Sequence, residues 1–140
     1  MSVVGYRDLK VWQASMDLVE SVYEATGKFP PSERYVLANQ IQRSVVSIPS
    51  NLAEGHARSS RRDYRRYVAI GRGSLAELET QLMIASRLRY IDSVALDKLL
   101  DRSEAIGKML RGLQVALERA EDAIAPSILD PRASIRPSNA

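Results

Sequence analysis

Cysteine is absent from the sequence, and among its 140 residues histidine, tryptophan and phenylalanine occur once each. Without cysteine, the chain has no disulfide framework, thiolate metal site or cysteine nucleophile. It also lacks any stretch near the roughly 18 apolar residues of a membrane span, and its first ten residues carry no secretory-signal pattern. We therefore expect a soluble, cytoplasmic protein with no membrane partner.

The strict alternation of apolar and polar residues that marks a half-buried strand is missing as well. Apolar residues instead recur three or four positions apart along most of the chain, which is the period of an amphipathic helix. With 45% apolar and 26% charged residues, the chain is long enough for one domain with a buried core. The sequence therefore predicts an all-α fold.

Four helical segments are expected, at about residues 7–26, 32–55, 60–88 and 92–117. Ser60 and Asp63 resemble a capping box at the start of the third segment, and Asp92 or Ser93 caps the fourth. Pro49 interrupts the second pattern, where a proline removes one helical hydrogen bond, so we expect a bent helix there. Four such helices with short connections pack most economically as an antiparallel up-down bundle.

The apolar stripes define the predicted core. In the first segment the stripe is Leu9, Trp12, Met16, Val19 and Tyr23; in the second it is Val36, Leu37, Ile41, Val45, Ile48 and Leu52. The third and fourth stripes extend from Tyr64 to Leu88 and from Leu96 to Leu117. Further apolar residues beside these stripes favour burial in a homo-oligomer. We assign the bundle to residues 1–125 and a flexible, proline-rich tail to residues 126–140.

A second, polar stripe follows the apolar stripe of the second segment, and the third segment has a matching set. The stripe on the second segment is Gln40, Arg43, Ser47, Asn51 and Glu54, and the matching set on the third is Ser74, Glu77 and Gln81. Between antiparallel neighbours these side chains would form a half-buried polar seam that fixes the register, because an unpaired buried polar group costs about 1–3 kcal/mol.

Two catalytic interpretations are weaker. Glu54 and His56 offer an acid–base pair, but no nucleophile or metal ligand stands at a suitable spacing. Gly71 and Gly73 suggest a phosphate loop, but no strand precedes them and the helical pattern continues through them. We therefore expect close helix packing at Gly71, and no catalytic residue, metal or cofactor.

Arginine accounts for sixteen of the twenty basic residues, and five of them lie within nine positions: Arg58, Arg61, Arg62, Arg65 and Arg66. They stand at the start of the third helix, where the helix dipole and like-charge neighbours disfavour cations. An anionic partner would offset this cost, because arginine forks and helix N-terminal amides bind phosphate. The sequence therefore predicts an RNA or DNA site, with an ionic subunit contact in a protein-interaction scaffold as the alternative.

Three stretches carry a family resemblance: YRDLKVWQASMDLVESVY, QIQRSVVSIPSNLAEGHARSS and YVAIGRGSLAELETQL. They resemble the four helix bundle proteins first noted as reading frames in intervening sequences of bacterial 23S ribosomal RNA genes. The resemblance covers roughly residues 5–92, and its most specific parts are the motifs S-I-x-x-N-x-A-E-G and G-S-L-x-E-L. By similarity, family motif positions fall on Ser47, Asn51, Glu54, Gly55, Ser74 and Glu77.

The resemblance implies an antiparallel bundle that assembles as a ring-like homopentamer without known catalytic activity. Relatives include the accessory variability protein of diversity-generating retroelements, which binds nucleic acid and a reverse transcriptase through a basic surface. The resemblance thus implies self-association, nucleic acid and a reverse transcriptase or another protein as partners of this chain.

Overall fold

The computed structural model describes the backbone of residues 5–124 and the side chains of residues 5–120. Its helices are η1 (Tyr6–Asp8), α1 (Lys10–Thr26), η2 (Pro31–Glu33), α2 (Leu37–His56), α3 (Arg61–Arg87) and α4 (Ser93–Ile124). Over these residues there is no strand, which confirms the all-α prediction. The predicted tail, residues 126–140, and the domain boundary at residue 125 lie outside the described residues.

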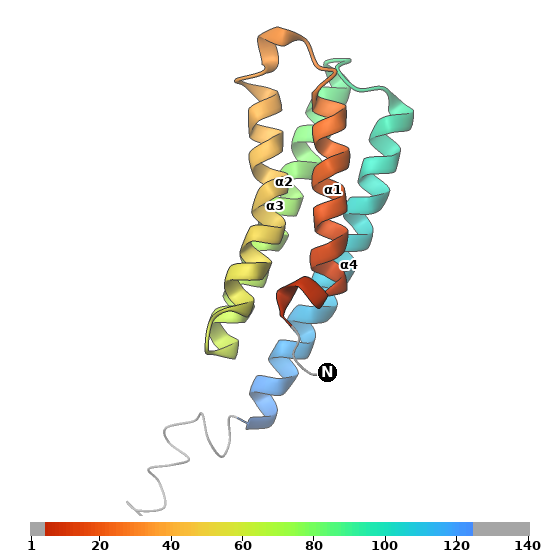
Figure 1. Ribbon diagram of the computed structural model, residues 1–140. Helices are drawn as coiled ribbons and strands as arrows, with labels where there is room; N and C mark the ends of the chain where they lie inside the picture. Colours follow the sequence, from red (N-terminus) through yellow and green to blue (C-terminus); the bar gives the residue numbers. More distant parts are fainter. Residues whose placement is uncertain (1–4, 125–140) are drawn as a thin grey trace, which may run out of the picture.

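The four long helices form one bundle in which successive helices point in opposite directions (Figure 1). The α1–α2 and α3–α4 connections meet at one end, which we call the closed end. The α2–α3 turn lies at the opposite end, together with η1 and the last turns of α4. Because the five clustered arginines belong to this turn and to the start of α3, we call it the basic end.

Side-chain caps fix where α3 and α4 begin. The backbone N–H of Asp63 donates to Ser60 Oγ at 3.0 Å, and that of Ala95 donates to Asp92 Oδ1 at 2.8 Å. Both caps were predicted, since they depend only on residues three apart. The second helix begins later than predicted, at Leu37. Consecutive prolines instead start the short η2, because proline fits the first turn of a helix.

The core is built from one buried stripe on each helix, as expected for α2, α3 and α4. Its largest fully buried side chains include Leu18, Ile41, Ile48, Leu52, Leu78, Leu82, Ile106 and Leu110. Each such side chain stabilises the fold by about 1.5–3 kcal/mol relative to an exposed one. Val36 and Leu88, predicted as core residues, are exposed because they lie just outside α2 and α3.

The predicted core stripe of α1 is wrong. The face of α1 that enters the core consists of Val11, Ser15, Leu18, Val22 and Thr26. Met16 and Tyr23 are exposed by 39% and 45%, and Trp12 and Val19 are half-buried. The sequence offers two neighbouring apolar stripes on this helix, and packing against α2 and α4 selects the other one. The outer apolar stripe of α1, which is Trp12, Met16, Val19 and Tyr23, therefore lies partly on the surface.

Pro49 is buried within α2, which continues through it as one helix, as predicted; a bend at this position stays a prediction. Gly71 is also buried in α3, but a Cβ atom there would lie 3.9 Å from the nearest atom, the carbonyl oxygen of Ile48. Because that is an ordinary contact distance, the packing at Gly71 leaves room for alanine. The expected close approach occurs elsewhere, at Gly55.

Candidate functional site

The polar seam between α2 and α3 exists, with a changed membership. Ser47 Oγ and Ser74 Oγ are 2.8 Å apart, and Asn51 Nδ2 donates to Ser47 Oγ at 2.8 Å and to its carbonyl oxygen at 2.7 Å. Asn51 thus supports the Ser47 hydroxyl that reaches across to α3. Gln81, which was predicted in this seam, accepts a hydrogen bond at 2.9 Å from the buried Ser44, which sequence reasoning missed.

The charged members of the predicted seam do not join it. Arg43 and Glu77 are exposed, and in the described part of the chain neither side chain makes a hydrogen bond or an ion pair. Together with the serines of the seam they line a surface groove of about 570 Å³ between α2 and α3. Glu54 is also outside the seam, because it turns toward the α2–α3 turn instead. The seam therefore consists of neutral groups that satisfy one another.

Glu54 belongs to an exposed polar cluster at the basic end, with Arg58 and Tyr67. Arg58 Nη2 donates to Glu54 Oε2 at 3.0 Å and contacts the hydroxyl of Tyr67 at 2.8 Å. The Tyr67 hydroxyl also lies 3.5 Å from the same carboxylate oxygen. The hydrogen bond to Glu54, followed by the interaction with Tyr67, raises the pKa of the exposed Arg58 guanidinium further above its ordinary value.

The ring of Tyr67 lies beside two arginines. The Cζ atoms of Arg58 and Arg66 are 5.0 Å and 4.8 Å from its centroid, within cation–π range. Arg58 comes from the turn, whereas Arg66 and Tyr67 are neighbours on α3. This tyrosine therefore positions two of the five arginines. The sequence contained a signal for this role, in the placement of Tyr67 beside the cluster, but its spacing suggested only the core stripe.

Gly55 explains how the end of α2 comes so close to α3. A Cβ atom at Gly55 would lie 2.7 Å from Cβ of Tyr67 and 3.1 Å from Cδ1 of Tyr64. The first distance is shorter than any side-chain carbon tolerates, and a Cβ atom is no flexible chain end. Only glycine permits the approach of the two helices that brings Glu54 within reach of Tyr67.

The remaining arginines differ in their surroundings. The side chains of Arg61 and Arg62 are exposed and, over the described residues, make no hydrogen bond or ion pair. Arg65 is half-buried and has an interaction partner. Arg62, Arg65 and Arg66 line a cleft of about 500 Å³ between α3 and α4, with Asp63, Gln114 and Glu118. Cations outnumber acids in this cleft, so the basic end keeps a surplus of positive charge.

The single histidine takes no part in an acid–base pair with Glu54. His56 packs edge-on against Tyr64, with ring centroids 5.6 Å apart, while Glu54 is engaged by Arg58. Among the described residues, no group of three or more histidine, aspartate or glutamate side chains is arranged to hold a metal ion. The same residues include no helix long and apolar enough to cross a membrane.

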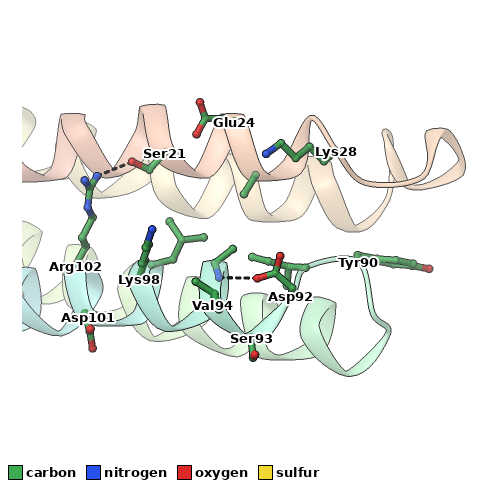
Figure 2. Close-up of a pocket in the computed structure, with 14 residues that line it drawn as sticks. Ser21, Glu24, Lys28, Tyr90, Asp92, Ser93, Val94, Lys98, Asp101 and Arg102 are labelled. Carbon is green, nitrogen blue, oxygen red and sulfur yellow. Dashed lines mark hydrogen bonds between the residues drawn. The ribbon is translucent and has the colours of Figure 1, made fainter.

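Another cleft, of about 840 Å³, lies at the closed end between the last turns of α1 and the first turns of α4. Figure 2 shows Arg102 reaching from α4 toward α1, where it donates to Ser21 Oγ at 2.6 Å. The lining mixes cations and acids: Lys28, Lys98, Arg102, Glu24, Asp92 and Asp101. Because the two signs balance, the cleft favours neither an anion nor a cation.

The comparisons with known proteins agree with this architecture. The family model for the 23S rRNA-intervening sequence protein matches residues 7–112. A solved structure from Bacteroides thetaiotaomicron, described as a protein of unknown function from the S23 ribosomal protein family, superposes with a TM-score of 0.68. It is 24% identical in sequence, and the match covers 74% of this chain and 97% of that one, which shows a shared fold. No curated protein matches the chain.

Proposed function

Because this chain belongs to the family of 23S rRNA-intervening sequence proteins, and because its bundle gathers five arginines at one end, we propose that it is a non-enzymatic, self-associating protein that binds RNA or DNA. The basic end is the binding surface. The cytoplasm is the proposed location. The resemblance to an accessory protein suggests that a reverse transcriptase or another protein joins the complex.

The observation that carries the proposal is the position of these arginines. Arg61, Arg62, Arg65 and Arg66 occupy the first two turns of α3, where the helix dipole already contributes positive charge. Arg61–Arg65 and Arg62–Arg66 are like-charge pairs four residues apart. The negative charges of a phosphate backbone would offset this repulsion. The guanidinium groups of Arg61 and Arg62 are exposed and have no partner among the described residues, so they are available to phosphates.

Self-association is supported by the outer apolar stripe of α1. Four apolar side chains at helical spacing, including one tryptophan and one tyrosine, are only partly covered by the bundle. Aromatic and methionine side chains are enriched at protein interfaces. A second copy of the chain would cover them, and the resemblance suggests a ring of five. A ring would place several basic ends on one assembly and let one polynucleotide contact several of them.

The binding test compares two triple variants with equal charge. The first variant removes three cations from the basic end, by Arg61→Gln, Arg62→Gln and Arg66→Gln. The second variant removes three cations elsewhere, by Arg34→Gln, Arg87→Gln and Arg89→Gln. Fluorescence anisotropy with labelled single-stranded RNA should show at least about tenfold weaker binding for the first variant, together with a shallower salt dependence of roughly 0.7 per lost phosphate contact.

The second variant serves as the control and should change affinity by less than about threefold. Equal losses in both variants would mean that only net charge matters and that the basic end is no site. Absence of binding by the unmodified protein in low salt would overturn the nucleic-acid function as a whole.

The assembly test uses light scattering at micromolar concentration. The unmodified chain should scatter as a multiple of its 15.6 kDa mass, and Met16→Glu should dissociate it, because a charge would be buried in the interface. Ala76→Glu adds the same charge at an exposed position of α3 and should leave the assembly intact. A monomeric unmodified protein would exclude the ring.

A protein-interaction scaffold is the second candidate, and the groove between α2 and α3 favours it. Tyr35, exposed by 80%, stands at this groove beside the exposed Val36. Arg43 and Glu77 line it without partners among the described residues. Exposed tyrosine and arginine are typical of binding hot spots. Loss of a co-purified protein partner in the Tyr35→Ala variant, with nucleic-acid binding absent, would favour the scaffold.

A further inference from the structure

The tyrosine ring beside the exposed arginines of the basic end is already occupied, and this limits what the end can recognise. Proteins that bind single strands through their bases stack those bases on free aromatic faces, which adds a large share of the affinity. A basic surface without such faces contacts only the charged backbone. The partners of each ring therefore indicate the chemical class of the ligand.

Tyr67 is the aromatic residue closest to the exposed arginines. Arg58 and Arg66 lie at 5.0 Å and 4.8 Å from its centroid, and its hydroxyl is engaged by Arg58 and Glu54. A base that stacked on this ring would have to displace a guanidinium group. That exchange gives up a cation–π contact for a stacking contact, so it gains little.

The other tyrosine rings near this end also have partners. Tyr64 packs on the core and against His56, and its burial raises the pKa of its hydroxyl above the ordinary value. Tyr6 lies edge-on to Trp12 at 5.4 Å, with the Cζ atom of Arg7 at 5.5 Å from its centroid. The strongly exposed Tyr35 belongs to the connection between η2 and α2, which is at the closed end.

We propose that the basic end recognises the phosphate backbone alone and makes no stacking contact with bases, so that its ligand class is a polyphosphodiester irrespective of sequence. In this arrangement Arg61, Arg62 and Arg66 contact phosphates, whereas Tyr67 and Glu54 are positioning residues that hold the guanidinium groups of Arg66 and Arg58. The inference rests on the proposed nucleic-acid function and specifies which part of the polymer is read.

The test compares two labelled DNA strands of equal length, one with bases and one built entirely from abasic residues. Anisotropy titrations of the full chain at one salt concentration should give dissociation constants within about twofold of each other, since the phosphates are the same. Stacking contributions would separate them by about tenfold or more. Weaker binding of the abasic strand by that factor would overturn the inference while leaving nucleic-acid binding intact. Failure of both strands to bind would instead overturn the proposed function.

Variants at Tyr67 separate a positioning role from a stacking role. Tyr67→Leu removes the ring and should weaken both strands equally, by about threefold, because Arg66 loses its support. Tyr67→Phe keeps the ring and should restore binding of both strands to within about twofold of the parent. A loss limited to the strand with bases would show that Tyr67 stacks on bases. No loss for either strand would show that Tyr67 positions nothing; circular dichroism confirms that each variant is folded.

Discussion

Each end of the bundle contains a tyrosine paired with a glutamate, but the two glutamates have different electrostatic surroundings. At the closed end Tyr90 donates to Glu33 Oε2 at 2.9 Å, and Glu33 Oε1 accepts from the backbone N–H of Leu37 at 3.2 Å. At the basic end Tyr67 and Glu54 form the corresponding pair, 3.5 Å apart, and Arg58 joins them. The pair at the closed end joins the α1–α2 connection to the α3–α4 connection, and the pair at the basic end joins α2 to α3.

The difference lies in how the carboxylate is satisfied. Glu33 is held by a neutral hydroxyl and a backbone amide, and the ring of Phe29 packs against Tyr90 with centroids 5.5 Å apart. Glu54 is held by Arg58, and the ring of Tyr67 beside it is also in contact with Arg66. The glutamate at the closed end is therefore held by neutral groups, whereas the glutamate at the basic end is held by a cation. Four predictions test this comparison.

The largest effect is expected where the basic end is most tightly packed. Gly55→Ala forces a methyl group to within 2.7 Å of Tyr67 Cβ, and such overpacking should lower the free energy of unfolding by about 1–3 kcal/mol in urea melts. Gly73→Ala is the matched control, since a Cβ atom there meets nothing within 4 Å, and it should raise stability by up to about 1 kcal/mol. Equal stabilisation by both variants would contradict the close approach at Gly55.

A smaller loss is expected in the seam between the two ends. Ser44→Ala leaves the buried Gln81 without its hydrogen-bond donor, which should lower the free energy of unfolding by about 1–2 kcal/mol. Ser50→Ala, at an exposed position of the same helix, is the control and should change stability by less than about 0.5 kcal/mol. If the two variants unfold alike, the seam contributes nothing to stability.

The charge surplus should itself cost stability. Replacing Arg61 and Arg62 by glutamine relieves two like-charge pairs at the start of α3, so the free energy of unfolding should rise by about 0.5 kcal/mol. The gain should shrink in high salt, which screens exposed charges. A decrease in stability would show that these arginines stabilise the folded protein, as the polar contacts of the closed end do.

The smallest effect concerns the free energy of unfolding at alkaline pH, where Tyr90 at the closed end loses its proton. The hydrogen bond to Glu33, with burial and the nearby charge, raises the pKa of Tyr90 above its ordinary value of 10.0. A pKa raised on folding adds stability that is complete below pH 10 and is lost as pH rises through the folded pKa. Tyr90→Phe should therefore show a shallower loss of stability above pH 10, measured by urea melts against pH. An unchanged slope would contradict the hydrogen bond.

Much of the fold follows from the sequence because it depends on residues close together in the chain. The 3–4 spacing of apolar residues in α2, α3 and α4 specifies both helices and buried faces. The caps at Ser60 and Asp92 involve residues three apart, so they too were predictable. The clustering of arginines is likewise a property of the sequence, and no folding is needed to bring them together.

Tertiary structure decided what depends on how one helix is rotated against another. Both apolar stripes of α1 satisfy the helical period, and only the positions of α2 and α4 select the one that contains Leu18. By its sequence position, Glu54 could join either the polar seam or the α2–α3 turn. The approach of α3 at Gly55 directs it to Arg58 and Tyr67 rather than into the seam. Helical periodicity fixes the angle of a residue about the axis of its helix. Which residue it meets on the neighbouring helix depends on how that helix is rotated, and only packing determines this rotation.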